Sequence, residues 1–448
     1  MGRIGAKKNI LIFSHSSSLG GAERSMINLV DILLNQGFSA LIVLPGRGPI
    51  EKELRRMSIP FLVVRYCWWA WPEKITAGQY LQSIHNVVSY LPRFVKFKPS
   101  CIITITAVIP WGMMTAQLLN VPHIWNITEF VEKDHGLIPE ITFPELAKII
   151  YLGSERIWFV SKAVQEEFEK YIPHNKSKVI HSQVDVPKLL AEEKIESPYK
   201  YADSFKIIMS SNVYPTKGQD QAIKAVRILI DKNYDVELLL IGRKRNENMK
   251  YFEKLIKFIG TKYKNRIYIS RFFNNPYPII LMSDLVLVCS RSEAFSRIMI
   301  ESGLLGKTFV ASNTGGNMEV DRKNGLFYEY GNSVDLANKI EYFIKNPGVF
   351  KKMSIDHQKH MQVNFQRNPN FIGVIPRQLK AVKKEATLVN TFGLVRKVLE
   401  KYHERGSYQT IKILSAELKA IKSSKNYRLW KKYHRVRDSI KGTLKLNE

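Results

Sequence analysis

Short apolar runs alternate with amphipathic segments along the first 185 residues. The sequence predicts strands at 9–13, 40–44, 61–64, 102–106, 123–125, 157–160 and 178–181. Several of these runs are apolar at every position, which is typical of strands that are covered on both faces of a sheet. Between the first two runs, residues 22–34 carry Met26, Leu29, Val30 and Leu33 at helical spacing. A strand, a helix and a strand at this interval indicate a parallel sheet.

The same alternation begins again after a charged, irregular segment. Residues 191–204 (AEEKIESPYKYADS) predict an interdomain linker. Beyond the linker we predict strands at 207–210, 237–241, 266–270, 285–288 and 308–311, and a clear amphipathic helix at 219–231. The pattern therefore predicts an α/β protein with two doubly wound domains, at 1–190 and 205–369. A cleft for a ligand is expected where the carboxyl ends of the strands face each other.

The charge of the chain is unusual. Its 448 residues include 68 Lys and Arg against 40 Asp and Glu, a formal net charge of +28, which favours an anionic partner. Residues 386–448 predict a basic helical tail, in which 427–441 gathers aromatic and aliphatic side chains on one face. Such a helix is typical of the surface of an anionic membrane. Packing on the protein itself and binding of nucleic acid are the alternatives, and the second lacks any recognisable nucleic-acid-binding signature.

The remaining composition bears on the compartment. Three scattered cysteines are too few for a disulfide framework or a zinc ribbon, and they favour a reducing compartment. No run reaches the roughly 18 to 20 apolar residues of a membrane-spanning helix. The first apolar run is also too short for a secretory signal. We therefore expect a cytoplasmic protein that lies peripherally at the inner face of the membrane.

Two turns between a strand and a helix carry residues suited to phosphate. Gly20 and Gly21 precede the helix at 22–34, where the backbone can approach a ligand and the helix N-terminus favours an anion. Lys217 and Gly218 stand at the start of the helix at 219–231, where an ammonium group can meet a phosphate. Each of these turns, taken alone, is also compatible with an ordinary structural turn.

Glu293 and Glu301 are a third candidate pair. If one helix carried both, a rise of 1.5 Å per residue would place them ~12 Å apart along its axis. Glycosidase carboxylates stand roughly 5–9.5 Å apart, so an acid/base pair of that kind is not expected. We instead expect the two glutamates to contact different parts of one extended ligand, with Glu301 accepting hydrogen bonds from ribose hydroxyls.

These residues resemble a known family. The segment EAFSRIMIESGLLGKTFVASNTGGNMEV, which begins at Glu293, is similar to the E-x7-E signature of family 4 retaining glycosyltransferases. Segments at 20–24, 160–163, 217–219 and 324–326 also match, in the family's order, so that the resemblance covers about residues 9 to 345. It implies a GT-B fold, with two facing Rossmann-like domains and a late helix, near 370–385, that crosses back to the first domain.

The resemblance also implies roles for single residues. Glu301 matches the ligand of the donor's ribose, Glu293 faces the donor sugar and its phosphates, and Lys217 neutralises the diphosphate. Gly20 and Gly21 match the phosphate-side loop of the first domain. Arg297 lies in the same donor-binding region.

Four positions depart from the family's pattern, and one of them is Ser296, which replaces the glycine after the phenylalanine of the signature. Asn212 stands where the family often has an arginine, and Arg243 is the candidate replacement for that cation. In the segment at 123–130, Asn126 and Thr128 replace a histidine and an arginine. Glu129 is kept, and we expect a catalytic role for it beside Glu293 and Lys217.

The sequence therefore predicts a retaining glycosyltransferase. It would move a sugar from a nucleoside diphosphate donor to a lipid-linked or polysaccharide-precursor acceptor, with His15, Asn126 and Thr128 on the acceptor side. No metal or other cofactor is expected, because Lys217 and helix dipoles can neutralise the leaving diphosphate. The alternatives are a binding protein with a degenerate donor site, and a sugar-nucleotide epimerase or phosphorylase on the same fold. A tryptophan-rich segment at 65–72 fits an acceptor platform, a lipid-facing patch or a simple packing cluster.

Overall fold

The computed structural model describes residues 8–71, 77–135, 138–139, 141–185, 196–243, 248–270, 273 and 275–366. The predicted crossing helix at 370–385 and the predicted basic tail at 386–448 lie outside the described residues, as does much of the predicted linker.

The first half of the chain forms a seven-stranded sheet in the order β3-β2-β1-β5-β6-β8-β9, with parallel pairing throughout. Its strands are β1 (Asn9–Phe13), β2 (Ser39–Leu44), β3 (Phe61–Val63), β5 (Cys101–Ile105), β6 (His123–Ile127), β8 (Arg156–Phe159) and β9 (Ser177–Val179). A separate antiparallel pair joins β4 (Ala70–Trp71) to β7 (Ile138–Pro139). The order of the sheet reverses between β1 and β5, which is where doubly wound sheets bind ligands.

Helices connect these strands. They are α1 (Gly21–Asn35), α2 (Ile50–Arg56), α3 (Ala77–Ser89), α4 (Leu91–Phe97), α5 (Trp111–Leu119), α6 (Glu132–His135), α7 (Phe143–Gly153) and α8 (Lys162–Glu169), with a short 3-10 turn, η1 (His174–Lys176), before β9.

The second half forms a six-stranded parallel sheet in the order β12-β11-β10-β13-β14-β15. Its strands are β10 (Phe205–Ser210), β11 (Val236–Ile241), β12 (Ile267–Ser270), β13 (Leu285–Val288), β14 (Phe309–Ser312) and β15 (Leu326–Tyr328). Its helices are η3 (Pro215–Lys217), α9 (Gln219–Asp231), α10 (Met249–Tyr263), α11 (Tyr277–Met282), α12 (Arg297–Leu304), α13 (Asn317–Val320), α14 (Ser333–Lys345) and α15 (Pro347–Asn364). This order reverses between β10 and β13.

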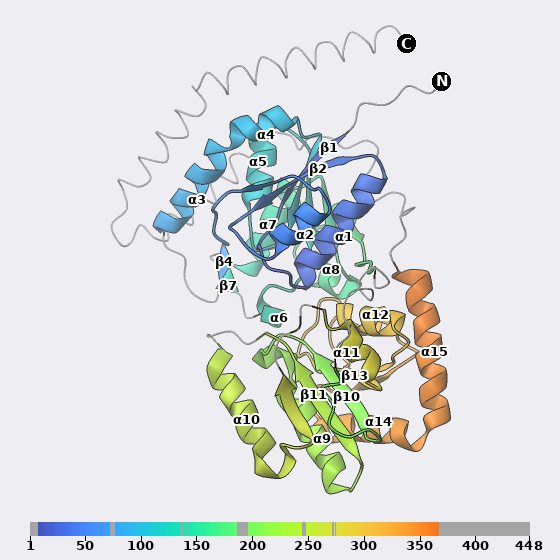
Figure 1. Cartoon of the computed structure of the whole chain (residues 1–448). Coiled ribbons are helices and arrows are strands. Elements are labelled where there is room, and N and C mark those ends of the chain that lie inside the picture. The colour runs from blue at the N-terminus through green and yellow to red at the C-terminus, as the bar shows by residue number, and fades with distance from the viewer. Residues whose placement is uncertain are drawn as a thin grey trace, which may run out of the picture.

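The two sheets with their helices form two bodies, one above the other in Figure 1. Both sheets are buried on both faces, and the side chains of β2, β5, β11, β13 and β14 illustrate this with almost no exposed position. This arrangement confirms the predicted α/β class and the two doubly wound sheets. The short strands β4, β7 and β15 were not predicted, because two or three residues carry too little periodic pattern.

The chain returns to the first body at the end of α15. This helix packs on α12 and α14 of the second body, along its side in Figure 1. Just beyond the helix, the carbonyl of Phe365 accepts a hydrogen bond from the N–H of Val184 (3.0 Å), and Gln366 forms a bridge with Val184. Backbone contacts near positions 184 and 365 therefore connect the two bodies.

Candidate functional site

Lys217 and Glu293 meet at the carboxyl ends of β10 and β13. The Lys217 Nζ lies 2.7 Å from the Glu293 Oε2, and their side chains are 18% and 19% exposed. Ser290 Oγ donates a hydrogen bond to the same carboxylate oxygen at 2.7 Å. The structure thus brings together two residues that the sequence places 76 positions apart.

A glycine allows Lys217 to reach this place. Gly218 has a φ of +72°, and a Cβ on it would lie 2.1 Å from the carbonyl oxygen of Cys289. Only glycine fits both the left-handed backbone and the close approach to the end of β13. The lysine is therefore held at the mouth of the second sheet by its own turn.

The Gly315–Gly316 turn supports Glu293 from the other side. A Cβ on Gly315, whose φ is +55°, would lie 2.2 Å from the carbonyl oxygen of Glu293. The N–H of Gly316 donates to that same carbonyl at 2.7 Å. The paired glycines thus fix the backbone of Glu293, which leaves its carboxylate directed at Lys217.

Glu301 lies in the second turn of α12 and pairs with Arg297. The Arg297 Nη2 is 3.1 Å from the Glu301 Oε1, and the two side chains are 13% and 9% exposed. Tyr277 is their neighbour: its burial, and then the charge of Glu301, raise the pKa of the tyrosine hydroxyl well above its ordinary value. Tyr277 therefore keeps its proton beside the carboxylate of Glu301.

Arg297 also crosses to the first body. Its Nη1 donates to the hydroxyl of Ser25 on α1 at 3.0 Å. A Cβ on Gly21, the first residue of α1, would lie 3.5 Å from the Cδ of Arg297. The N-terminus of α1 therefore contacts the Arg297–Glu301 pair of the second body.

Glu23 is a residue of this region that the sequence did not single out as a candidate. It is 3% exposed, its Oε1 lies 3.3 Å from the His15 Nε2, and Ser18 Oγ donates to it at 2.9 Å. Burial opposes ionisation of Glu23, but the charge of His15 and hydrogen bonds from Ser16 and Ser18 outweigh it, so the pKa lies below its ordinary value. Glu23 thus orients His15. Its place in the G-G-A-E-R turn was the available signal.

Glu129 is engaged by the backbone at the end of β6. It is 5% exposed, and its two oxygens accept hydrogen bonds from the Ala107 N–H, the Thr128 N–H and the Thr128 hydroxyl. These contacts tie the end of β6 to the loop that follows β5. Asn126 lies half-buried within β6, with its carbonyl accepting from the Thr106 N–H. The geometry gives Glu129 a positioning task, and its catalytic role stays a prediction.

Arg243 lies beside Asn212, the position at which the family often has an arginine. Its carbonyl accepts a hydrogen bond from the N–H of Val213 at 3.1 Å, directly after Asn212. The neighbouring Gly242 has no room for a side chain, because a Cβ there would lie 1.8 Å from the carbonyl oxygen of Ser211. The loops after β10 and β11 are therefore in contact, which brings Arg243 next to the Asn212 loop.

A helix cap at the N-terminus of α8 joins the two bodies. The carboxylate of Glu319 on α13 accepts hydrogen bonds from the N–H groups of Lys162 and Ala163, both at 2.6 Å. These donors open α8 and have no partner within their own helix. The ring of His181 also stacks on Phe295 with centroids 4.6 Å apart. Glu319 is therefore an N-terminal cap supplied by the opposite body.

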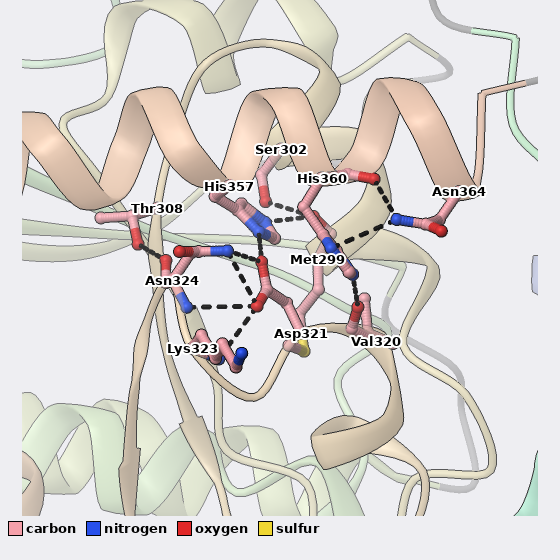
Figure 2. A network of polar contacts seen from close by, with 10 residues as sticks. All are labelled: Met299, Ser302, Thr308, Val320, Asp321, Lys323, Asn324, His357, His360 and Asn364. Atoms are coloured by element: carbon pink, nitrogen blue, oxygen red, sulfur yellow. Dashed lines mark hydrogen bonds and ion pairs between the residues drawn. The ribbon is translucent and has the colours of Figure 1, made fainter.

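A buried network supports α12 from behind (Figure 2). His357 on α15 is 0% exposed; its Nδ1 lies 2.7 Å from the Asp321 Oδ2 and its Nε2 3.0 Å from the carbonyl of Met299. Both ring nitrogens face acceptors, so the ring can donate from both only as an imidazolium. A Cβ on Gly303 would lie 2.5 Å from the His357 Nε2, which explains the glycine on this face of α12. The network fixes the helix that carries Glu301.

Hydrogen bonds and ring stacking show how two tryptophans of the segment at 65–72 are held. The indole N–H of Trp68 donates to the carbonyl of His15, and that of Trp69 to the carbonyl of Ala107, both at 2.6 Å. Trp69 is 3% exposed and stacks on Trp125. The burial of Trp69 and these hydrogen bonds favour the packing alternative.

Two features are absent from the described ranges. No cluster of three or more histidine, cysteine or acidic side chains in that part of the chain is arranged to hold a metal ion. Within the same residues, each helix is too short or too polar to cross a membrane.

Comparisons with known proteins agree with this geometry. Residues 191–361 match the family model "Glycosyl transferases group 1". The putative glycosyltransferase YtcC of Bacillus subtilis is 23% identical over 225 residues, which are 46% of this chain and 54% of YtcC. CapM of Staphylococcus aureus, a capsular polysaccharide biosynthesis glycosyltransferase, is 24% identical over 180 residues, 39% of this chain and 47% of CapM. The chain thus matches about half the length of these relatives.

Solved structures agree over a larger span. The complex of Anabaena Alr3699/HepE with UDP-glucose superposes with a TM-score of 0.66 at 21% identity, over 80% of this chain and 96% of that one. This similarity shows the fold, which is GT-B. Residues 191–361 thus match the group 1 glycosyl transferases, in agreement with the family that the E-x7-E segment resembles.

Proposed function

We propose that this chain is a retaining glycosyltransferase that transfers a sugar from a UDP-sugar donor to an acceptor in polysaccharide assembly. The observation that carries the proposal is the meeting of the two bodies at Arg297. Its guanidinium pairs with Glu301 and donates to Ser25 on α1, next to Gly21, while the Lys217–Glu293 pair lies at the carboxyl ends of β10 and β13 of the same body. The UDP-glucose held by the HepE structure and the polysaccharide role in CapM's name support the donor and the pathway class.

The ion pairs of the unliganded cleft would exchange partners when the donor binds. Glu301 would accept hydrogen bonds from the ribose hydroxyls, with Arg297 holding the carboxylate in place. Lys217 would turn from Glu293 to the diphosphate, and the N-terminus of α1 would face the same phosphates. Glu293, held by the glycine turn, would then be released toward the donor sugar.

This exchange supplies the chemistry. As the bond between the sugar's C1 and the diphosphate oxygen breaks, negative charge grows on the leaving UDP. Once the donor is bound, Lys217 and the amides that open α1 would be directed at that charge and would stabilise it as it grows. The acceptor hydroxyl would approach from the side of His15, Asn126 and Thr128, in keeping with the retention expected from the family.

The acceptor and its location are further parts of the proposal. The +28 charge and the basic segment at 386–448 support an acceptor linked to lipid at the cytoplasmic face of an anionic membrane. Flotation of the full chain with anionic and neutral vesicles tests this part by itself. Binding to both kinds of vesicle, or to neither, would contradict it.

Release of UDP from UDP-glucose, in the presence of a panel of saccharide acceptors, tests the transferase. We expect turnover by the wild type and a loss of roughly 10²–10³-fold in Lys217→Gln, because one stabiliser of the leaving charge is removed. Lys224→Gln is the matched control, since Lys224 lies on α9 and is 49% exposed. UDP-glucose that binds but is never cleaved would instead support the degenerate binding protein.

A further inference from the structure

A cavity of about 780 Å³, widely open to solvent, lies at the β3 edge of the first sheet. One wall is formed by residues that follow β2 and β3, among them Arg47 and Arg65, and the other by α3. The cavity is therefore at the carboxyl ends of parallel strands, the edge of an α/β sheet where ligands bind. None of the residues assigned above to the donor lines it.

The lining combines apolar surface with positive charge and side-chain amides. Two guanidinium groups, Arg47 and Arg65, share it with the carboxamides of Gln79, Gln82 and Asn86, and no acidic side chain is found among its described lining residues. A guanidinium fork matches the oxygens of a phosphate or carboxylate, and carboxamides suit sugar hydroxyls. The chemistry fits an anionic saccharide.

The two arginines differ in their present partners. Arg47 Nη1 lies 2.8 Å from Glu51 Oε2, so one nitrogen of its guanidinium already has an acidic partner. The Arg65 side chain is exposed, and its guanidinium makes no hydrogen bond or ion pair with any residue of the described ranges. The backbone carbonyl of Arg65 is held by Asn86 Nδ2 at 2.9 Å, which fixes the base of the side chain. Arg65 is thus the cation best placed to accept a new anionic partner.

Hydrogen bonds join this cavity to the loop at the cleft. The hydroxyl of Tyr66, a lining residue, lies 2.6 Å from the carbonyl of Ser14. On the opposite side, Ser17 Oγ donates to the carbonyl of Gly46 at 2.6 Å. Ser14 and Ser17 belong to the loop that contains His15 and ends at Gly20. The loop that contains His15 is therefore held directly against the lining of the cavity.

We propose that this cavity binds an oxyanion, the phosphate or carboxylate of an anionic acceptor, with Arg65 as its principal ligand and Arg47 as the second. The identification of the ligand as an acceptor rests on the proposed function, whereas the capture of an oxyanion does not. A phosphate would come from a phosphorylated or lipid-linked saccharide, and a carboxylate from an acidic sugar.

A cysteine in the cavity makes occupancy measurable without any turnover. Cys67 lines the cavity and is half-buried, while Cys101 and Cys289 are buried. Ser83 Oγ lies 3.2 Å from the Cys67 Sγ and is a lining residue too. A ligand on Arg65 would cover this thiol and slow its alkylation.

The experiment follows the rate of alkylation of Cys67 by N-ethylmaleimide in the full chain, by peptide mass spectrometry, with and without saturating UDP. The probes are glucose 1-phosphate, glucuronic acid and neutral glucose. UDP occupies the donor site and so keeps glucose 1-phosphate out of it. We expect at least one anionic probe to slow alkylation about fivefold and glucose to leave it unchanged. The probe that slows alkylation of Cys67 shows whether the site prefers a phosphate, as in glucose 1-phosphate, or a carboxylate, as in glucuronic acid.

Variants connect the protection to the arginine. Arg65→Gln should abolish protection, while Arg93→Gln, an exposed arginine of α4 outside the cavity, should retain it. Equal protection by glucose, protection that survives in Arg65→Gln, or no protection by either anion would each overturn the proposal. UDP binding, recorded in the same samples, keeps the two proposals apart. Protection without UDP binding would contradict only the proposed transferase function. UDP binding without protection would contradict only the proposed oxyanion site.

Discussion

The buried Asp321–His357 pair makes a quantitative prediction about stability. Asp321 is 3% exposed and receives hydrogen bonds from His357 Nδ1, the Lys323 N–H and the side chain of Asn324 (Figure 2). Burial by itself would raise the pKa of this carboxyl, but these donors outweigh it and lower the pKa from 3.8 to about 2. Replacing Asp321 by Asn keeps the shape of the side chain and removes the charge.

The magnitude follows from the shift. A pKa depressed from 3.8 to about 2 corresponds to about 2 kcal/mol in favour of the charged carboxylate in the folded protein. Because the folded pKa is the lower one, this stability is fully present above the unfolded pKa and is lost as the pH falls through the folded pKa. Asp321→Asn should therefore be about 2 kcal/mol less stable at pH 7, and the deficit should shrink to about half at pH 3.

Urea unfolding of both proteins between pH 7 and pH 3 measures this difference. Asp356→Asn is the matched control, because Asp356 precedes His357 on α15 but its carboxylate takes no part in the network. Its stability should stay close to that of the wild type at every pH. Equal stability of Asp321→Asn and the wild type at pH 7, or a deficit that does not change with pH, would refute the reasoning.

Three further substitutions test the supports of the cleft. Gly303→Ala should destabilise the protein by about 1–3 kcal/mol and weaken UDP binding, because its Cβ would overlap His357 behind α12, whereas Gly348→Ala meets open space and should be neutral in urea unfolding. Glu319→Ala should cost about 1 kcal/mol by uncapping α8, and small-angle scattering should show a more open protein; an unchanged radius of gyration would contradict the cap's role. Gly218→Ala should move Lys217 and abolish turnover, and full activity would show that the left-handed turn is dispensable.

Much of the fold could be predicted from local pattern. The helix at 219–231 and the strands at 9–13 and 285–288 have the predicted bounds, since their apolar positions repeat with one clear period. The pairing of Lys217 with Glu293 could be anticipated only through the family's motif. Local pattern gives strand ends, but not which side chains meet there.

Contacts between the two bodies could not be predicted. Glu319 caps a helix whose first residue is 157 positions earlier, and Arg297 reaches Ser25 across 272 positions. Nothing in the local sequence of Glu319 distinguishes a carboxylate that caps a helix of the other body from one that is simply solvated. The same holds for His357, whose two acceptors come from α12 and from the loop before β15.

The central claim is that this cleft binds a nucleoside diphosphate sugar through Glu301, and a thermal-shift panel tests it most directly. UDP, GDP, ADP, TDP and CMP would be compared on the wild type, on Glu301→Gln, and on Glu166→Gln, whose glutamate is 62% exposed on α8. At about 100 times its dissociation constant, UDP should add about 2.7 kcal/mol to the stability of the wild type and the control. That gain should be lost in Glu301→Gln. Stabilisation by none of the five nucleotides, or a full effect of UDP on Glu301→Gln, would contradict the proposed donor site.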